Sequence, residues 1–183
     1  MKQFKGRVIA PGTVTAEAVV SRGGFNTLAS LQGALQFGDK KATCGDQNNP
    51  DLHGKELAGK ALCLPMTIGS TTGGLVLYCA CAMERQPACM LFSKPIDSLA
   101  AAGSILASVW LDGIQMPVVD SLGDEFLEAV KHGDTVEVKE NGIVVIQGDT
   151  KFPCGHRRMG ILYQCDKLLF AGMARRKCVT NAG

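Results

Sequence analysis

The sequence lacks a long apolar run, and this absence excludes a membrane-spanning helix. A bilayer requires about 20 consecutive apolar residues. The longest apolar-rich stretch, residues 99–111, is interrupted by Gly103, Ser104 and Ser108. The first residues also lack the apolar core of a secretory signal and lead directly into strand-like sequence. We therefore expect a cytoplasmic protein with no membrane partner.

A large excess of charge of one sign is also missing. The chain has 183 residues, with 19 Lys and Arg against 17 Asp and Glu, and 46% of its residues are hydrophobic. An apolar fraction of this size with so little net charge excludes a chain that is disordered throughout. The length fits one ordinary domain with its own core and is too short for two full-sized domains.

The charges are nevertheless unevenly distributed along the chain. Residues 1–150 hold 12 basic and 16 acidic residues, a net charge of −4, whereas residues 151–183 hold 7 basic residues and 1 acidic residue, a net charge of +6. We therefore predict a domain over residues 1–148 and a basic, cysteine-containing extension over residues 149–183. The extension has no pattern of aromatic residues for base stacking and the domain is acidic, so we expect no nucleic-acid partner.

Cysteine is plentiful, but the usual cysteine motifs are missing. The chain has eight cysteines and no C-x-x-C pair. Four of them lie in apolar segments, where a thiol packs as a small hydrophobic group, and we expect them to be reduced: Cys63, Cys79, Cys81 and Cys89. The spacing of the His and Cys residues of the extension matches no usual zinc site, so no metal site is predicted there: Cys154, His156, Cys165 and Cys178.

The order of the short apolar segments predicts an α/β fold. We expect strands at residues 6–10, 14–20, 60–65, 88–92, 117–119, 135–138 and 143–147, and helices at residues 75–83, 96–110 and 124–131. The turn Pro11-Gly12 separates the first two strands, and Asn141-Gly142 is the strongest hairpin signal in the chain. Because strands and helices alternate in the centre, we expect a partly parallel central sheet with β-hairpins at its ends.

The segment between the strand at residues 60–65 and the following helix is the most typical of a binding site. It contains the run Gly69-Ser70-Thr71-Thr72-Gly73-Gly74. Free amides at a helix start favour an anion, and glycines allow a ligand close to the backbone. The run is neither a Walker A loop nor a dinucleotide-binding fingerprint. Two interpretations remain: a loop that binds a carboxylate or phosphate, or a helix start capped by a Ser or Thr side chain.

Two further polar residues are candidate ligands for an anion. Arg22 precedes Gly23-Gly24 directly after a predicted strand, and an arginine can form a bidentate pair with a carboxylate or phosphate. His53 lies in a polar loop just before the next predicted strand. In both cases the alternative is a solvated side chain on a surface turn.

A series of short motifs follows in order along residues 5–147. Its members are Gly6-Arg7-Val8, Pro11-Gly12, Glu17-Ala18, His53-Gly54, Leu57-Ala58-Gly59-Lys60, Gly69-Ser70-Thr71-Thr72-Gly73-Gly74, Pro87-Ala88, Ile96-Asp97, Ala102-Gly103, Pro117-Val118-Val119-Asp120 and Gly133-Asp134. The ordered series resembles the small subunit, or swivel domain, of aconitase X and is far more specific than any one motif. The extension has no counterpart in this resemblance.

The resemblance implies a swivelling β/β/α domain that closes over an iron–sulfur cluster carried by a larger catalytic subunit. Members of the family are hydro-lyases, and the serine of the Gly-Ser-Thr loop, here Ser70, is their proposed proton acceptor. We expect the anionic substrate to be held by Gly69, Thr71, Thr72 and Gly73. Arg22 and His53 are weaker candidates for the same role. The cluster is expected on the partner, because no cysteine of the domain matches a cluster-ligand pattern.

From this resemblance we predict the small subunit of a two-chain hydro-lyase that is inactive without its large subunit. The predicted substrate is a small hydroxy acid such as cis-3-hydroxy-L-proline, and the alternative substrate is mevalonate 5-phosphate. A function of another class is also open, namely a non-catalytic module that binds an anion or another protein.

Overall fold

The computed structural model describes residues 1–148, and the predicted extension with its cysteines and histidine lies outside the described residues. The strands are β1 (Lys2–Lys5), β2 (Arg7–Ala10), β3 (Val14–Val20), β4 (Phe25–Asn26), β5 (Ala61–Leu64), β6 (Thr67–Ile68), β7 (Cys89–Phe92), β8 (Val118–Asp120), β9 (Thr135–Val138) and β10 (Ile143–Gln147). The helices are α1 (Thr27–Phe37), α2 (Gly73–Ala82), α3 (Ser98–Trp110) and α4 (Asp124–Ala129).

The main sheet is partly parallel, as the sequence predicted. Its strand order is β1-β10-β9-β3-β5-β7-β8-β2. The pairs β3–β5, β5–β7 and β7–β8 are parallel, whereas β2, β9, β10 and β1 join the sheet by antiparallel pairs. Strand β3 bridges the two parts, since its first half pairs with β9 and its second half with β5.

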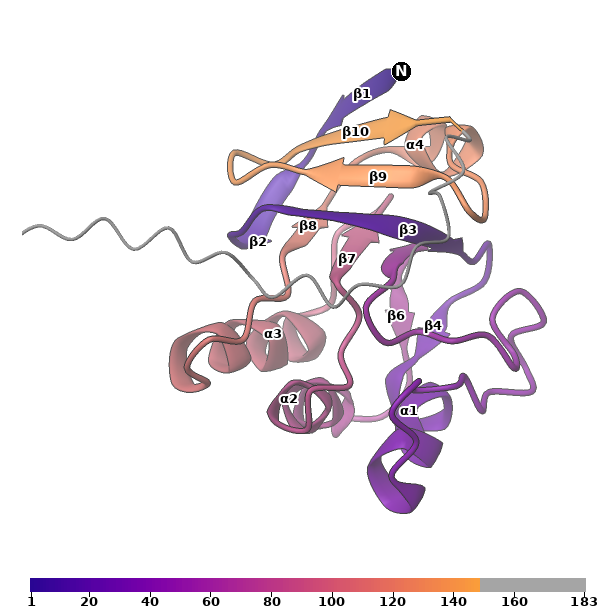
Figure 1. Ribbon diagram of the computed structural model, residues 1–183, viewed down its shortest axis with the longest axis vertical. Coiled ribbons are helices and arrows are strands. Elements are labelled where there is room, and N and C mark those ends of the chain that lie inside the picture. Colours follow the sequence, from indigo (N-terminus) through magenta and orange to yellow (C-terminus); the bar gives the residue numbers. More distant parts are fainter. Residues whose placement is uncertain (149–183) are drawn as a thin grey trace, which may run out of the picture. The chain divides into compact units, whose positions relative to one another are not determined.

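The elements form three layers, which confirms the β/β/α arrangement. Helices α1, α2 and α3 cover one face of the strands β5, β7 and β8, while the β9–β10 hairpin and α4 lie on the other side (Figure 1). Successive side chains of a strand point to opposite faces. Leu62 and Met90 accordingly belong to the core under the helices, and Cys63 and Leu91 to the core under the hairpin. All residues of β5 and β7 are buried.

The cysteines of the domain are free, as expected. Cys63, Cys81 and Cys89 are buried and Cys79 is half-buried. Burial raises the pKa of Cys81 to about 11 and that of Cys89 to about 12. These thiols are therefore protonated near neutral pH and pack as hydrophobic groups.

The first two predicted strands do not form a hairpin, contrary to the expectation of hairpins at the ends of the sheet. Strand β2 pairs with β8, and β3 pairs with β5 and β9. A further strand, β1, precedes Gly6 and pairs with β10. The chain therefore bends at Gly6 and contributes to both ends of the strand order, whereas the Asn141-Gly142 hairpin between β9 and β10 is confirmed.

Helix α1 was not predicted. Its first turn is capped by Asn26, whose Oδ1 accepts a hydrogen bond from the amide of Ala29 at 3.2 Å, and Gly38 ends it with a φ of +76°. An Asn before a helix and a Gly after it are usual start and stop signals. Gly33 lies inside the helix and weakens its intrinsic preference for helix, which is why the segment did not stand out.

The other helices differ from prediction only at their ends. Helix α2 begins at Gly73, α3 begins at Ser98 after the capping residue Asp97, and α4 ends at Ala129. No helix within residues 1–148 combines the length and the apolar character needed to cross a bilayer.

Candidate functional site

A small two-stranded ladder positions the Gly-Ser-Thr loop. Phe25 and Asn26 of β4 pair in parallel with Thr67 and Ile68 of β6. Gly69 follows with a φ of +121°, a conformation that favours glycine, and a Cβ placed on it would lie 3.1 Å from the Asn26 Oδ1. The loop consequently passes over the start of α1 before it enters α2.

The Ser70 hydroxyl lies at the exposed start of this loop. Its Oγ is 2.6 Å from the Thr72 Oγ1, and its carbonyl accepts a hydrogen bond from the amide of Gly73 at 3.1 Å. Thr72 occupies the capping position of α2, yet its side chain makes no capping hydrogen bond. The run is therefore a helix start with Thr72 at its cap, but the Thr72 side chain does not supply the capping bond. The Ser70 Oγ instead accepts a hydrogen bond from the Thr72 amide at 3.4 Å.

A cavity of about 250 Å³ opens beside Ser70, between the loop and the start of α3. Gly69 and Gly73 also line it. Polar side chains contribute hydroxyls and one carboxylate, namely Thr27, Thr67, Ser70, Ser98 and Asp97. None of its lining residues is Lys, Arg or His. Small polar groups of a substrate can therefore find hydrogen bonds in this cavity, but an anion finds no cation there.

Asp97 is the functional candidate that the sequence reasoning did not identify. Its Oδ1 accepts hydrogen bonds from the amides of Leu99 at 2.9 Å and Ala100 at 3.0 Å, and the Thr67 hydroxyl donates to its Oδ2. Partial burial raises the pKa of Asp97, but the hydrogen bonds from Thr67 and the two amides outweigh it, so the pKa lies below its usual value. The available signal was an Asp directly before a predicted helix.

Arg22 and His53 lie outside the cavity that Ser70 lines. Both are exposed, on neighbouring loops joined by a hydrogen bond from the Asn49 Nδ2 to the Ser21 Oγ at 2.9 Å. The Arg22 amide donates to the Asp51 carboxylate at 2.7 Å. The structure thus brings Gly69, Ser70 and Gly73 together in one cavity and does not add Arg22 or His53 to it.

Thr71 and Thr72 are both exposed on the same loop. Thr71 lines a second, apolar groove between α2 and α3, whereas Thr72 contacts the Ser70 hydroxyl. The predicted substrate-binding set is therefore divided between the polar cavity, the rim of the groove and the loops of Arg22 and His53.

The described residues do not fit an iron–sulfur cluster. Within residues 1–148 no group of three or more His, Cys, Asp or Glu side chains is arranged to hold a metal ion. Burial raises the pKa of Cys63 well above its usual value, and the nearby Cys89 raises it further. A buried, protonated thiol is a poor metal ligand, because the thiolate is the form that binds metal.

The sequence of the described domain matches a known family. The sequence model of the aconitase X swivel domain matches residues 3–146. The chain belongs to this family. The crystal structure of Thermococcus kodakaraensis aconitase X in its holo-form resembles the aconitase X swivel fold of this chain with a TM-score of 0.66 and 26% identity, and the match covers 80% of this chain and 99% of that one.

Curated relatives of this aconitase X swivel domain are named as dehydratase subunits. The phosphomevalonate dehydratase small subunit of Methanosarcina mazei is 31% identical over 136 residues, which cover 74% of this chain and 84% of the relative. The protein of the same name from Methanocaldococcus jannaschii is 30% identical over 145 residues, which cover 79% and 97%. The chain is thus a subunit of a dehydratase, a hydro-lyase, as the resemblance implied.

Proposed function

We propose that this chain is the small subunit of a two-chain hydro-lyase and that Ser70 removes a proton from the substrate. The observation that carries the proposal is the exposed Ser70 hydroxyl, which contacts the Thr72 hydroxyl beside a polar cavity. The relatives' names support a small subunit that works with a large one. We expect this enzyme in the cytoplasm.

Dehydration removes a proton from one carbon and a hydroxyl group from its neighbour, and the proposal assigns the proton to this chain. A serine hydroxyl becomes an effective base only when its alkoxide is stabilised. The Thr72 hydroxyl can donate to the Ser70 Oγ at 2.6 Å. Helix α2 begins directly after Thr72, so the positive end of its dipole lies next to this pair of hydroxyls. Closing the cavity against a partner would exclude water and strengthen both interactions.

The proposed partner is an aconitase X-type large subunit, and we assign the iron–sulfur cluster to it. This chain's described residues offer no ligand set for such a cluster. The cavity beside Ser70 holds one carboxylate and no cation, so the positive groups that neutralise an anionic substrate are assigned to the partner as well.

For the substrate we propose mevalonate 5-phosphate, ahead of the cis-3-hydroxy-L-proline that was the first prediction from the sequence. The names of the curated relatives support this order. Within this proposal Gly69 and Gly73 line the substrate cavity, while Thr71 and Thr72 contribute from the exposed loop that continues from Ser70. Arg22 and His53 could contact only a substrate group that extends beyond the cavity.

The test is to co-express the chain with an aconitase X-type large subunit and to assay the complex with both substrates. We expect dehydration of mevalonate 5-phosphate by the complex and none by the isolated chain. Ser70→Ala should lower kcat by about 10²- to 10⁴-fold, the usual range for loss of a general base, while the complex still assembles. Ser108→Ala is the matched control, since the Ser108 hydroxyl is exposed and donates to the Ile105 carbonyl on α3.

A Ser70→Ala complex with full turnover would overturn the catalytic assignment. Turnover of cis-3-hydroxy-L-proline but not of mevalonate 5-phosphate would overturn the substrate assignment. An inactive complex together with tight binding of inorganic phosphate by the isolated chain would instead favour the non-catalytic anion-binding module.

A further inference from the structure

Helices α2 and α3 contain no charged residue, although both lie at the surface. Their sequences are GGLVLYCACA and SLAAAGSILASVW. A helix that packs on a core and faces water on its other side normally carries charged or polar residues on that outer side. Here the outer side carries Leu75, Val109 and Trp110, which are 63%, 68% and 66% exposed.

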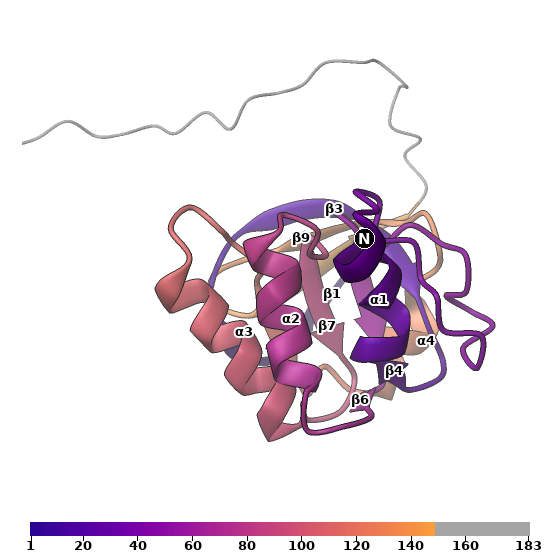
Figure 2. The same ribbon diagram turned by 90° about the horizontal axis from the view of Figure 1, so that it is seen from below.

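The two helices pack so closely that they present one continuous surface. A Cβ on Gly74 would lie 2.1 Å from the Leu99 carbonyl oxygen, and one on Gly103 would lie 2.0 Å from the Gly74 carbonyl oxygen. Only glycine fits at such a backbone contact. The helices run next to each other beneath the sheet, with α1 beyond α2 (Figure 2).

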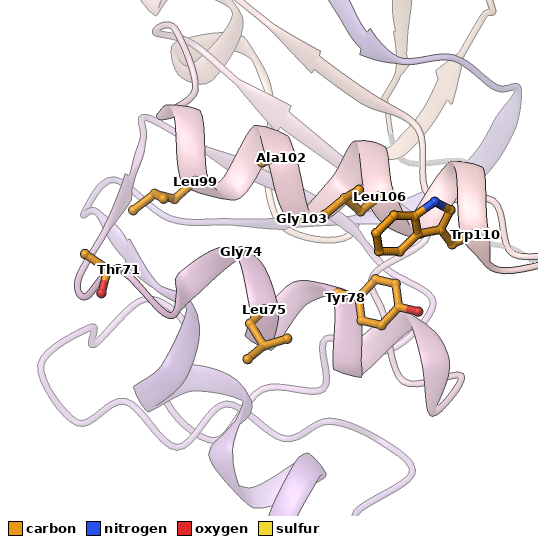
Figure 3. A pocket seen from close by; sticks show the side chains of 9 residues that line it. All are labelled: Thr71, Gly74, Leu75, Tyr78, Leu99, Ala102, Gly103, Leu106 and Trp110. Atoms are coloured by element: carbon orange, nitrogen blue, oxygen red, sulfur yellow. The ribbon is translucent and has the colours of Figure 1, made fainter.

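An apolar groove of about 290 Å³ runs between these helices. Leu75, Tyr78, Leu99, Leu106 and Trp110 line it (Figure 3). The rings of Tyr78 and Trp110 meet edge to face at one end, with their centroids 6.3 Å apart. Exposed apolar patches of this kind mark interaction sites, and Trp and Tyr are the residues that most often dominate the energy of an interface.

The groove adjoins the cavity of Ser70. Leu99 lines both the groove and the cavity. Thr71, which lines the groove, directly follows Ser70, which lines the cavity. The cavity contains a carboxylate and no cation, so an anionic substrate bound there needs positive groups from a second surface close to it. A molecule seated on the α2–α3 groove lies where it can supply them.

We propose that the α2–α3 groove is the docking surface for the large subunit of the dehydratase. The inference rests on the proposed two-chain function and identifies which face of this chain makes the complex. The partner surface it requires is apolar where it meets Leu106, Val109 and Trp110, and cationic where it meets the cavity of Ser70.

The test measures the affinity of the full-length chain for the large subunit. We expect Trp110→Glu, at the end of the groove opposite Thr71, and Val109→Glu, on the exposed surface of α3 next to it, to raise the Kd at least about tenfold, because each places a charge in an apolar interface. Phe37→Glu is the matched control on α1, where the ring is 84% exposed, and it should change the Kd less than about twofold. Circular dichroism establishes whether each variant is folded. If Trp110→Glu does not fold, the affinity of Val109→Glu decides the test.

Kinetics separate this proposal from the proposed function. With saturating large subunit, Val109→Glu should recover the wild-type kcat, whereas Ser70→Ala should keep the wild-type Kd and lose kcat. Unchanged affinity in both α3 variants, in an active complex, overturns the docking surface and leaves the proposed function standing. A wild-type chain that neither binds the large subunit nor gives activity with it overturns both.

Hydroxyl-radical footprinting of Trp110 tests whether the groove is covered instead by a second copy of the chain or by residues 149–183. We expect strong labelling of the free chain at every concentration and strong protection in the complex. Protection that appears in the free chain only at high concentration identifies a second copy as the occupant. Protection of the free chain even at high dilution identifies residues 149–183, and either result overturns the proposal.

Discussion

The strands β5, β7 and β8 are covered on both faces, by α4 and the β9–β10 hairpin on one side and by helices on the other. The helices on the two sides differ in the side chains that they expose to water. On the hairpin side, α4 buries Phe126 and Leu127 and exposes Asp124, Glu125 and Glu128. On the other side, α2 and α3 expose leucine, valine and tryptophan and carry no charge. The first cover has the amphipathic pattern of a helix that faces water, whereas the second has the composition of an interface.

The candidate site lies on the uncharged side. Ser70 lies in the loop that leads into α2, and Asp97 caps α3. The Ser70 hydroxyl thus lies next to the helices whose outer surface lacks charged residues. Four stability measurements on the free chain test this contrast between the two covers.

The largest difference is expected from one substitution made on both sides. Leu91→Ala removes a fully buried side chain from the core under the hairpin and should lower the free energy of unfolding by about 3 kcal/mol. Leu75→Ala, on the exposed face of α2, should change it by less than about 0.5 kcal/mol. Urea denaturation measures both values, and equal losses would show that the α2 face is as buried as the core.

The next effect concerns the glycine contact between α2 and α3. Gly103→Ala places a Cβ 2.0 Å from the Gly74 carbonyl and should cost about 2 kcal/mol, because the helices must move apart. The control is Gly33→Ala in α1, where no atom lies within 4 Å of the new Cβ. That variant should gain about 0.5–1 kcal/mol, the usual advantage of Ala over Gly in a helix. A stabilising Gly103→Ala would rule out the close packing.

A pH-dependent effect is expected where β8 meets β2. The Asp120 side chain is fully buried and accepts hydrogen bonds from Arg7 at 2.6 Å and from the Ile96 amide at 2.9 Å. Burial raises the pKa of Asp120, but the hydrogen bonds from Arg7 and Ile96 lower it further than burial raises it. The folded pKa is thus below the unfolded value of about 3.9, so this carboxylate stabilises the fold above about pH 4 and loses that effect as the pH falls further.

Asp120→Asn should therefore lower the free energy of unfolding by about 1.5 kcal/mol at pH 7 and by less at pH 3. Urea denaturation at both pH values measures the difference. Asp112→Asn, at an exposed turn after α3, is the control and should leave the stability near wild type at both. A deficit of the same size at pH 7 and pH 3 would contradict the role of the charged form.

The smallest effect is expected on the uncharged face itself. Val109→Lys should change the free energy of unfolding of the isolated chain by less than about 0.5 kcal/mol, since the side chain is 68% exposed. Thermal denaturation followed by circular dichroism measures it. A loss of stability as large as that of Leu91→Ala would mean that Val109 is covered within the free chain and would end the comparison.

Local signals were sufficient for much of the fold. Apolar runs predicted the buried strands β5 and β7, and Asn141-Gly142 predicted the β9–β10 hairpin, because both patterns depend on neighbouring residues. The prediction failed where the partner is distant. Strand β4 has two residues, Phe25 and Asn26, which are too few to show the alternating pattern of a strand. The change of partner along β3, from β9 to β5, leaves no signal in the sequence of β3 itself.

The order of residues along the chain was enough to indicate the α/β class, the family resemblance and the position of Ser70 between a strand and a helix. Three further features follow from the folded arrangement. Asp97 shares a cavity with Ser70, Arg22 and His53 lie outside that cavity, and the uncharged sides of α2 and α3 face outward. The surroundings of a side chain depend on which distant surfaces pack together. An uncharged helix has the same sequence pattern whether its outer side is buried or exposed.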